Sequence, residues 1–182
     1  MLFRSPNTAV ITSPILNNTT MTGLIAGDYT FRWTISNGPC STSSDDVTIT
    51  VFTAPTQSNA GPNQVLCDLT SATLAGNTIT LGAGLWTQIS GPNTAGITSP
   101  TVANSEITNL IPGVYVFDWT STLAPCSSSD QVQITIDALP TTANAGTDIS
   151  ICLFDPLVLA GNTPTSGNGI WSQISGPTTV TF

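Results

Sequence analysis

The chain contains no lysine and no histidine, and only Arg4 and Arg32 carry positive charge. Charged residues make up 7% of the 182 residues, and the net charge is −8. Nucleic acids and anionic membranes are bound through basic patches, so we expect neither nucleic-acid binding nor membrane insertion. A serine or threonine nucleophile would lack its usual base, which argues against catalysis. The absence of lysine also excludes stabilisation by Lys–Asn isopeptide cross-links.

Carboxylates are the remaining candidates for acid–base chemistry, since a pair of them can hydrolyse a glycosidic bond. Glu106 is the single glutamate, and the aspartates lie mostly at predicted strand ends and turns. Asp45 and Asp46 are adjacent, so on a strand they point to opposite faces. We therefore assign no catalytic residue and expect the protein not to be an enzyme.

Calcium is the one metal that this composition suits, because it binds carboxylate and carbonyl oxygens. Asp137 and Asp148 flank a predicted linker, and Asn144 lies between them. One interpretation is a calcium site between two domains. The alternative, which we favour, is that these are solvated turn residues, so we expect no cofactor.

An internal repeat dominates the chain. Three segments occur twice, 85 or 86 residues apart: 23–34 with 109–120, 74–78 with 159–163, and 86–92 with 171–177. A fixed period in both halves predicts a tandem array of one module of about 85 residues. The phase predicts that residues 1–52 are the C-terminal part of one module, 57–137 a complete module, and 142–182 the N-terminal part of a further one. We therefore expect the chain to be a fragment of a longer array. Its linkers are short and contain proline, so they should hold neighbouring modules at restricted angles.

Alternation of apolar and polar residues predicts strands along the module. In 114–120 the alternate residues Tyr115, Phe117 and Trp119 share one face, which we expect to be the core side. Further strands are predicted at 28–34, 46–51, 64–67, 72–75, 84–89, 105–110 and 131–137. No apolar repeat has helical spacing, and glycine- and proline-containing turns separate the strands. The chain is therefore predicted to be all-β, with each module a sandwich.

The aromatic residues allow two interpretations. They could form a sugar-stacking platform, or they could fill the cores of the sandwiches, and the strand alternation favours cores. The predicted core aromatics are Tyr29, Phe31, Trp33, Trp86, Tyr115, Phe117, Trp119 and Trp171.

The four cysteines occur once per half-module, which suggests disulfides and an oxidising compartment; buried free thiols are the alternative. Counting within the complete module pairs Cys67 with Cys126, and Cys40 would then meet Cys152 if the two partial modules associate. However, Cys67 is expected near Ile136, about ten residues along the last strand from Cys126. Either the loop that carries Cys126 folds back, or each cysteine bonds across a module junction.

Several motifs resemble PKD-like, immunoglobulin-like repeats of very large cell-surface proteins of Bacteroidetes, including gliding and adhesion proteins. They are Ala-Gly-Pro-Asn-Gln at 60–64, Leu-Ala-Gly-Asn at 74–77, Trp-Thr-Gln-Ile-Ser-Gly-Pro at 86–92 and Pro-Gly-Val-Tyr-Val-Phe at 112–117. The resemblance implies tandem Ig-like sandwiches, secreted or at the cell surface. Trp86 and Trp171 then take the position at which such folds bury a tryptophan.

We therefore expect a non-enzymatic, rod-like spacer or adhesin stalk. Its partners would be neighbouring modules of the same chain and surface glycans or other cell-surface proteins. The alternative is a carbohydrate-binding accessory module of a secreted polysaccharide-degrading enzyme. An exposed aromatic cluster on one sheet face would favour that alternative.

Overall fold

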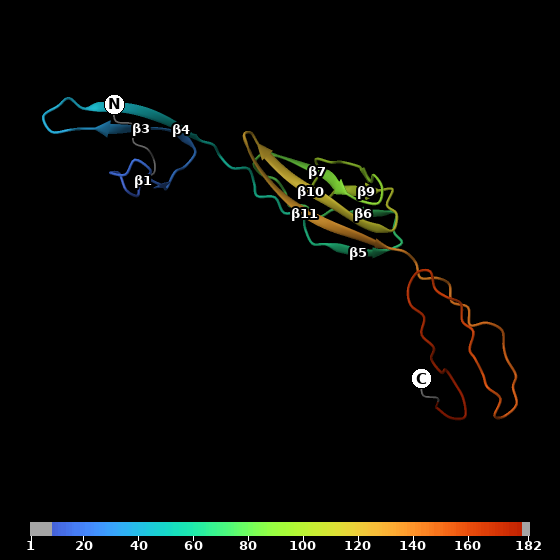
Figure 1. The fold of residues 1–182 in the computed structure, drawn as a ribbon. Helices are drawn as coiled ribbons and strands as arrows, with labels where there is room; N and C mark the ends of the chain where they lie inside the picture. The colour runs from blue at the N-terminus through green and yellow to red at the C-terminus, as the bar shows by residue number, and fades with distance from the viewer. Residues whose placement is uncertain (1–8, 180–182) are drawn as a thin grey trace.

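The computed structural model describes residues 9–179, and every regular element within them is a β-strand. Three parts follow one another in space, with the largest in the middle (Figure 1). We call residues 9–51 the N-terminal hairpins, residues 56–137 the central sandwich and residues 142–179 the C-terminal segment. Among the described residues there is no helix of the length and hydropathy that a transmembrane helix requires.

The central sandwich contains two sheets. The larger has the strand order β5-β11-β10-β7, with β5 parallel to β11 and the other neighbours antiparallel. These strands are β5 (Gln64–Cys67), β7 (Ala83–Ser90), β10 (Gly113–Leu123) and β11 (Cys126–Asp137). The smaller sheet has the order β6-β9-β8, formed by β6 (Ser71–Thr73), β8 (Gly96–Ile97) and β9 (Glu106–Thr108). The predicted all-β sandwich is confirmed.

The core of the sandwich follows from the period-two alternation of β10. Tyr115, Phe117 and Trp119 are buried, whereas Val114 on the opposite face is exposed. The antiparallel register places Tyr115 opposite Ile134 on β11, so buried residues of the two strands form one apolar face. Trp86 and residues of the smaller sheet cover this face and complete the core.

The N-terminal hairpins consist of two separate pairs of strands. The strands β1 (Val10–Ile11) and β2 (Met21–Thr22) pair with each other, and β3 (Gly27–Ile35) pairs with β4 (Ser43–Val51). No third strand joins either pair within the described residues. The face of β3–β4 that corresponds to the core face of β10–β11 lies against β1 and β2 only, and no counterparts of β5, β6 and β7 accompany it within the described residues.

Two expectations about core aromatics are wrong for this reason. The side chain of Trp33 is 43% exposed and that of Trp171 is 42% exposed, whereas Trp86 and Trp119 are each 1% exposed. Tyr29 and Phe31 are only half-buried. The local sequence around Trp33 is nearly that around Trp119. The difference comes from the neighbours of Trp119, such as Asn77, Gly84 and Trp86, whose counterparts are absent beside Trp33 in the described residues.

The C-terminal segment contains no strand within its described residues, although the repeat predicts that it supplies the first strands of a module. In the central sandwich the corresponding strand β5 exists because it pairs with β11. The C-terminal segment has no such neighbour, and a strand without a pairing partner has no ladder of hydrogen bonds. Its large apolar side chains, such as Leu153, Val158 and Ile170, are exposed.

Predicted strand boundaries differ from the observed ones mainly at the hairpin between β10 and β11. Both strands extend to the pair Leu123–Cys126, well beyond the predicted ends at 120 and 131. Residues 127–130 are Ser-Ser-Ser-Asp, which show no apolar alternation. Backbone pairing with the neighbouring strand, rather than burial, forms this part of the sheet. The short strand β8 has no counterpart among the predicted strands.

Candidate functional site

The aromatic side chains of the central sandwich all point into its core. The rings of Trp86 and Trp119 lie 4.9 Å apart between centroids. Trp86 Nε1 donates to the carbonyl of Ala103 at 3.1 Å, and Trp119 Nε1 donates to the carbonyl of Asn77 at 3.2 Å. Because both indole N–H groups have partners inside the protein, the pair is part of the core and offers no ring face to a ligand.

The first residues of the central sandwich are bonded to β11 through side chains. Ser58 donates through Oγ to the carbonyl of Ser128 at 2.8 Å. The backbone N–H of Ala60 donates to Oδ2 of Asp130, also at 2.8 Å. Asp130 therefore joins the segment that precedes β5 to β11, which gives this carboxylate a structural role.

Two asparagines form a cluster of side-chain-to-backbone hydrogen bonds, which we call the asparagine cluster. Asn59 N donates to Asn77 Oδ1, and Gly61 N donates to Asn59 Oδ1, each at 2.8 Å. Gly61 has φ +82°, and a Cβ there would lie 2.5 Å from the carbonyl oxygen of Ala75. Glycine is required at this turn because of both the backbone conformation and the lack of space.

All four cysteines are free thiols in the structure. Cys67 ends β5 opposite Asp137, whereas Cys126 begins β11, eleven residues before Asp137. Eleven residues of extended strand span about 36 Å, whereas a disulfide needs Cα atoms within about 7 Å. The expected Cys67–Cys126 pair within one module is therefore wrong, because the two thiols lie at opposite ends of the sandwich. Bonding across a module junction stays a prediction.

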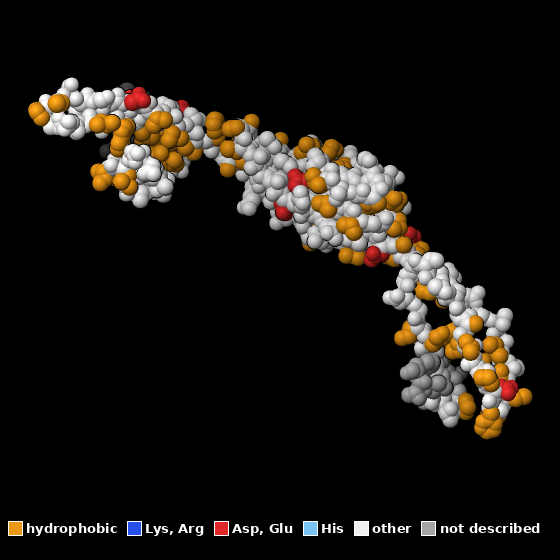
Figure 2. All heavy atoms as spheres, in the orientation of Figure 1, with side chains coloured by type: hydrophobic (Ala, Val, Ile, Leu, Met, Phe, Trp, Pro, Cys, Tyr) orange, Lys and Arg blue, Asp and Glu red, His pale blue; other side chains and the backbone are white. Residues whose placement is uncertain are grey.

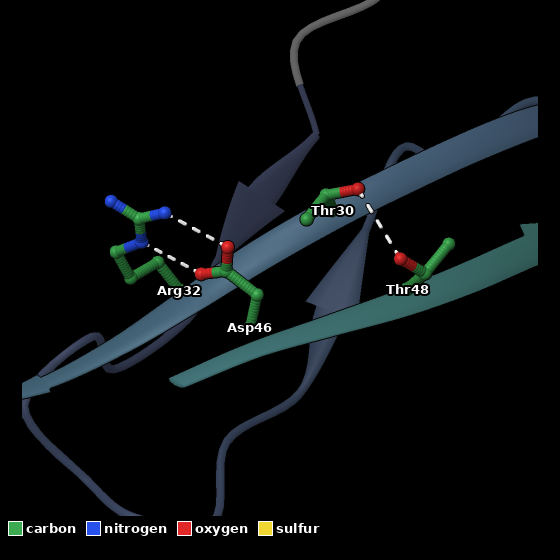
Figure 3. Close-up of polar contacts among 4 residues, drawn as sticks. All are labelled: Thr30, Arg32, Asp46 and Thr48. Atoms are coloured by element: carbon green, nitrogen blue, oxygen red, sulfur yellow. Dashed lines mark hydrogen bonds and ion pairs between the residues drawn. The ribbon is translucent and has the colours of Figure 1, made fainter. Parts of the chain in front are cut away.

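One ion pair lies on the outer face of the N-terminal hairpins (Figure 3). Arg32 donates from Nε and Nη2 to the two carboxylate oxygens of Asp46, at 2.7 and 2.8 Å. The hydroxyls of Thr30 and Thr48 lie 3.4 Å apart along the same strands. The hydrogen bond and the charge of Arg32 lower the pKa of Asp46, and the same contacts raise that of Arg32. Both side chains are solvent-exposed, so the pair contributes little to stability.

The remaining acidic side chains are scattered (Figure 2). Within residues 9–179, no three side chains of the cysteine, histidine or carboxylate type come together as a group that could hold a metal ion. Asp137 and Asp148 are exposed residues on either side of the linker. The calcium interpretation has no further support and stays a prediction.

The concave surface of most interest lies on the N-terminal hairpins. A hollow of about 310 Å³ is lined by apolar residues of all four strands, including Ile11, Met21, Phe31, Trp33 and Val47. Phe31 and Trp33 correspond in the repeat to the buried Phe117 and Trp119. The hollow is therefore an uncovered half of a core, at positions that the sequence predicts to be buried.

Comparison with known proteins gives one family match, which lies within the central sandwich. Residues 60–136 match the protein family described as K319L-like, PKD domain. No curated protein matches the sequence of the chain.

Three solved structures show weak overall similarity. The solution structure of the PKD domain from KIAA 1837 protein is 21% identical with a TM-score of 0.41, over 56% of this chain and 99% of that one. The endo-fucoidan hydrolases MfFcnA4 and MfFcnA9, from glycoside hydrolase family 107, are 15% and 17% identical, with TM-scores of 0.32 and 0.31. They are matched over 76% and 72% of this chain, which spans only 23% and 28% of theirs.

Proposed function

We propose that this protein is a non-enzymatic segment of an extracellular repeat protein, which acts as a rod-like spacer or adhesin stalk. The match of residues 60–136 to a PKD domain family supports a module of this kind. Charged residues make up only 7% of the chain, and its polar residues are mainly ones with hydroxyl and amide groups.

The observation that carries the proposal is the path of the chain through the central sandwich. The chain enters beside the start of β11, where Ser58 is bonded to Ser128, and leaves at Asp137, at the end of β11. Entry and exit are therefore separated by the extended strand from Ser128 to Asp137, about 30 Å. When the chain enters each module at one end and leaves it at the other, successive modules are connected end to end.

The same path suits a part that bears tension. Residues 58–67 follow β11 along its length. Ser58 is hydrogen-bonded to Ser128, and the short strand β5 pairs in parallel with the end of β11, up to Cys67 opposite Asp137. A force that pulls the two linkers apart acts along the direction of β11. The hydrogen bonds between residues 58–67 and β11 are then loaded at the same time and do not break one after another.

A carbohydrate-binding module is not favoured by any feature of the central sandwich. Its four aromatic side chains, Trp86, Tyr115, Phe117 and Trp119, are all buried. Sugar stacking requires an exposed ring face. Adhesion to glycans or to other surface proteins would therefore have to use the polar surface or regions outside residues 56–137.

Small-angle X-ray scattering tests the rod. The samples are this chain and versions that carry one and two additional copies of residues 53–137, at concentrations where light scattering gives the mass of a single chain. The maximum dimension should increase by about 30 Å or more with each added copy. A dimension that grows only slightly, as expected for a compact particle, would refute the proposed function. Glycan-array binding that depends on an aromatic residue would instead support the carbohydrate-binding module.

A further inference from the structure

Both linkers of the chain end in the same dipeptide, Pro55-Thr56 before the central sandwich and Pro140-Thr141 before the C-terminal segment. The backbone N–H of Thr56 donates to the carbonyl of Leu81 at 2.9 Å. In return, Oγ1 of Thr56 accepts from the backbone N–H groups of Thr80 and Leu81, at 3.1 and 2.8 Å. The end of the first linker is therefore bonded to the loop that precedes β7.

The hydroxyl group of Thr56 uses its full hydrogen-bonding capacity in this contact. Its oxygen has two lone pairs, and the two backbone N–H groups occupy both. The hydroxyl proton is left to donate to Oγ1 of Thr80, 3.1 Å away. Valine has nearly the same shape but no hydroxyl, so at this position it makes none of these three bonds. The contact therefore depends on a hydroxyl side chain at residue 56.

The same contact recurs at the second linker, 85 residues later. The backbone N–H of Thr141 donates to the carbonyl of Ser166 at 3.0 Å. Oγ1 of Thr141 accepts from the backbone N–H groups of Thr165 and Ser166, at 2.8 and 3.0 Å. The C-terminal segment contains no strand within its described residues, so the contact does not require a complete sandwich.

The proline of each linker packs on a glycine of the same loop. A Cβ at Gly82 would lie 3.3 Å from Cβ of Pro55, and one at Gly167 would lie 3.3 Å from Cβ of Pro140. The φ angles of these glycines are +103° and +81°, a region that favours glycine. Proline also restricts the residue before it to extended conformations. The linker therefore reaches the loop in a defined direction.

The two linkers also have the same length. Val51 pairs with Gly27 as Ile136 pairs with Gly113, so Val51 and Ile136 are equivalent positions in the hairpins that they end. In each case the Pro-Thr dipeptide begins four residues later. The same proline, the same threonine contact and the same length therefore occur at two junctions of one chain.

We propose that the threonine at the end of each linker is a clamp that fixes the linker to the module that follows. Bending is then confined to residues 52–54 in the first linker and to residues 138–139 in the second, which lie between the last strand and the clamped proline. In Figure 1 a single stretch of chain connects the central sandwich to the part on each side. The clamp deepens the proposed spacer function, on which its role rests, because a rod keeps its length only if few residues between modules can turn.

Hydrogen exchange of the full chain, followed by NMR, tests the clamp. Thr56→Val removes the hydroxyl acceptor, so exchange at the backbone N–H groups of Thr80 and Leu81 should become faster by about fivefold. Thr56→Ser keeps the hydroxyl and should restore the slow exchange. The matched control is Thr53→Val, in the exposed part of the same linker, which should leave both rates unchanged. In all three variants the N–H of Ala60, bonded to Asp130, should stay protected if the sandwich is intact.

Order parameters of the backbone N–H groups provide a second readout, which needs no variant. In the unmodified chain, Thr56 should be as rigid as the strands of the central sandwich, at about 0.85, whereas residues 52–54 should have lower values. In Thr56→Val the low values should extend to residue 57, just before Ser58, which is bonded to Ser128.

Two results would overturn the clamp. One is exchange at Thr80 and Leu81 that is the same with threonine and valine at residue 56. The other is an order parameter of Thr56 in the unmodified chain that is as low as those of residues 52–54. Neither depends on the scattering test of the rod. A maximum dimension that does not grow with added copies refutes the spacer even where the clamp bonds are intact, whereas a growing dimension with an unprotected Leu81 N–H refutes only the clamp.

Discussion

Replacing Trp119 by alanine should remove much of the stability of the central sandwich. The side chain is 1% exposed, packs on Trp86 at 4.9 Å, and its indole N–H has the carbonyl of Asn77 as partner. Loss of a buried tryptophan costs about 3–5 kcal/mol through lost transfer free energy and the cavity that remains. A domain of this size is stable by about 5–15 kcal/mol in total, so the variant should be close to unfolding.

Urea unfolding followed by far-ultraviolet circular dichroism measures this loss, because most strand residues belong to the central sandwich. The matched control is Val114→Ala, also on β10 but on the outer face and 47% exposed, which should cost less than about 1 kcal/mol. Equal unfolding midpoints for the two variants would refute the assignment of the aromatic face of β10 to the core.

Three further predictions concern local contacts. Gly84→Ala should destabilise the central sandwich by about 1–3 kcal/mol in the same urea assay, because the new Cβ would lie 2.4 Å from the ring of Trp119; an unchanged midpoint would show that this ring can move aside. Asp130→Ala should cost about 1–3 kcal/mol, because it leaves the backbone N–H of Ala60 without its acceptor, and faster hydrogen exchange at that N–H would report the loss. Arg32→Ala should raise the pKa of Asp46 towards the ordinary aspartate value of about 3.9, as followed by NMR titration of the carboxyl carbon. Because the carboxyl pKa is lowered in the folded hairpin, the small stabilisation by this pair is present above the unfolded-state pKa and is lost as pH falls through the folded value; a carboxyl pKa that is the same with and without Arg32 would contradict the argument.

The local properties of the fold could be predicted from the sequence. The alternation in 114–120 identifies the strand and its buried face, because side chains on a strand alternate between two sides. The copied segments predict a complete module at 57–137, and this range stays a prediction; the family match covers residues 60–136.

The tertiary structure alone decided which residues of the repeat have partners. Trp33 and Trp119 have nearly the same neighbours in sequence, yet one is exposed and the other buried. Trp119 is covered by residues 76–86, including Trp86, whereas no counterparts of these residues lie beside Trp33 in the described part of the chain. Counting pairs Cys67 with Cys126, but the parallel register of β5 with β11 places them at opposite ends of the module. Alternation specifies which face of a strand is apolar. The residues that cover that face come from distant parts of the chain, and the local sequence pattern does not identify them.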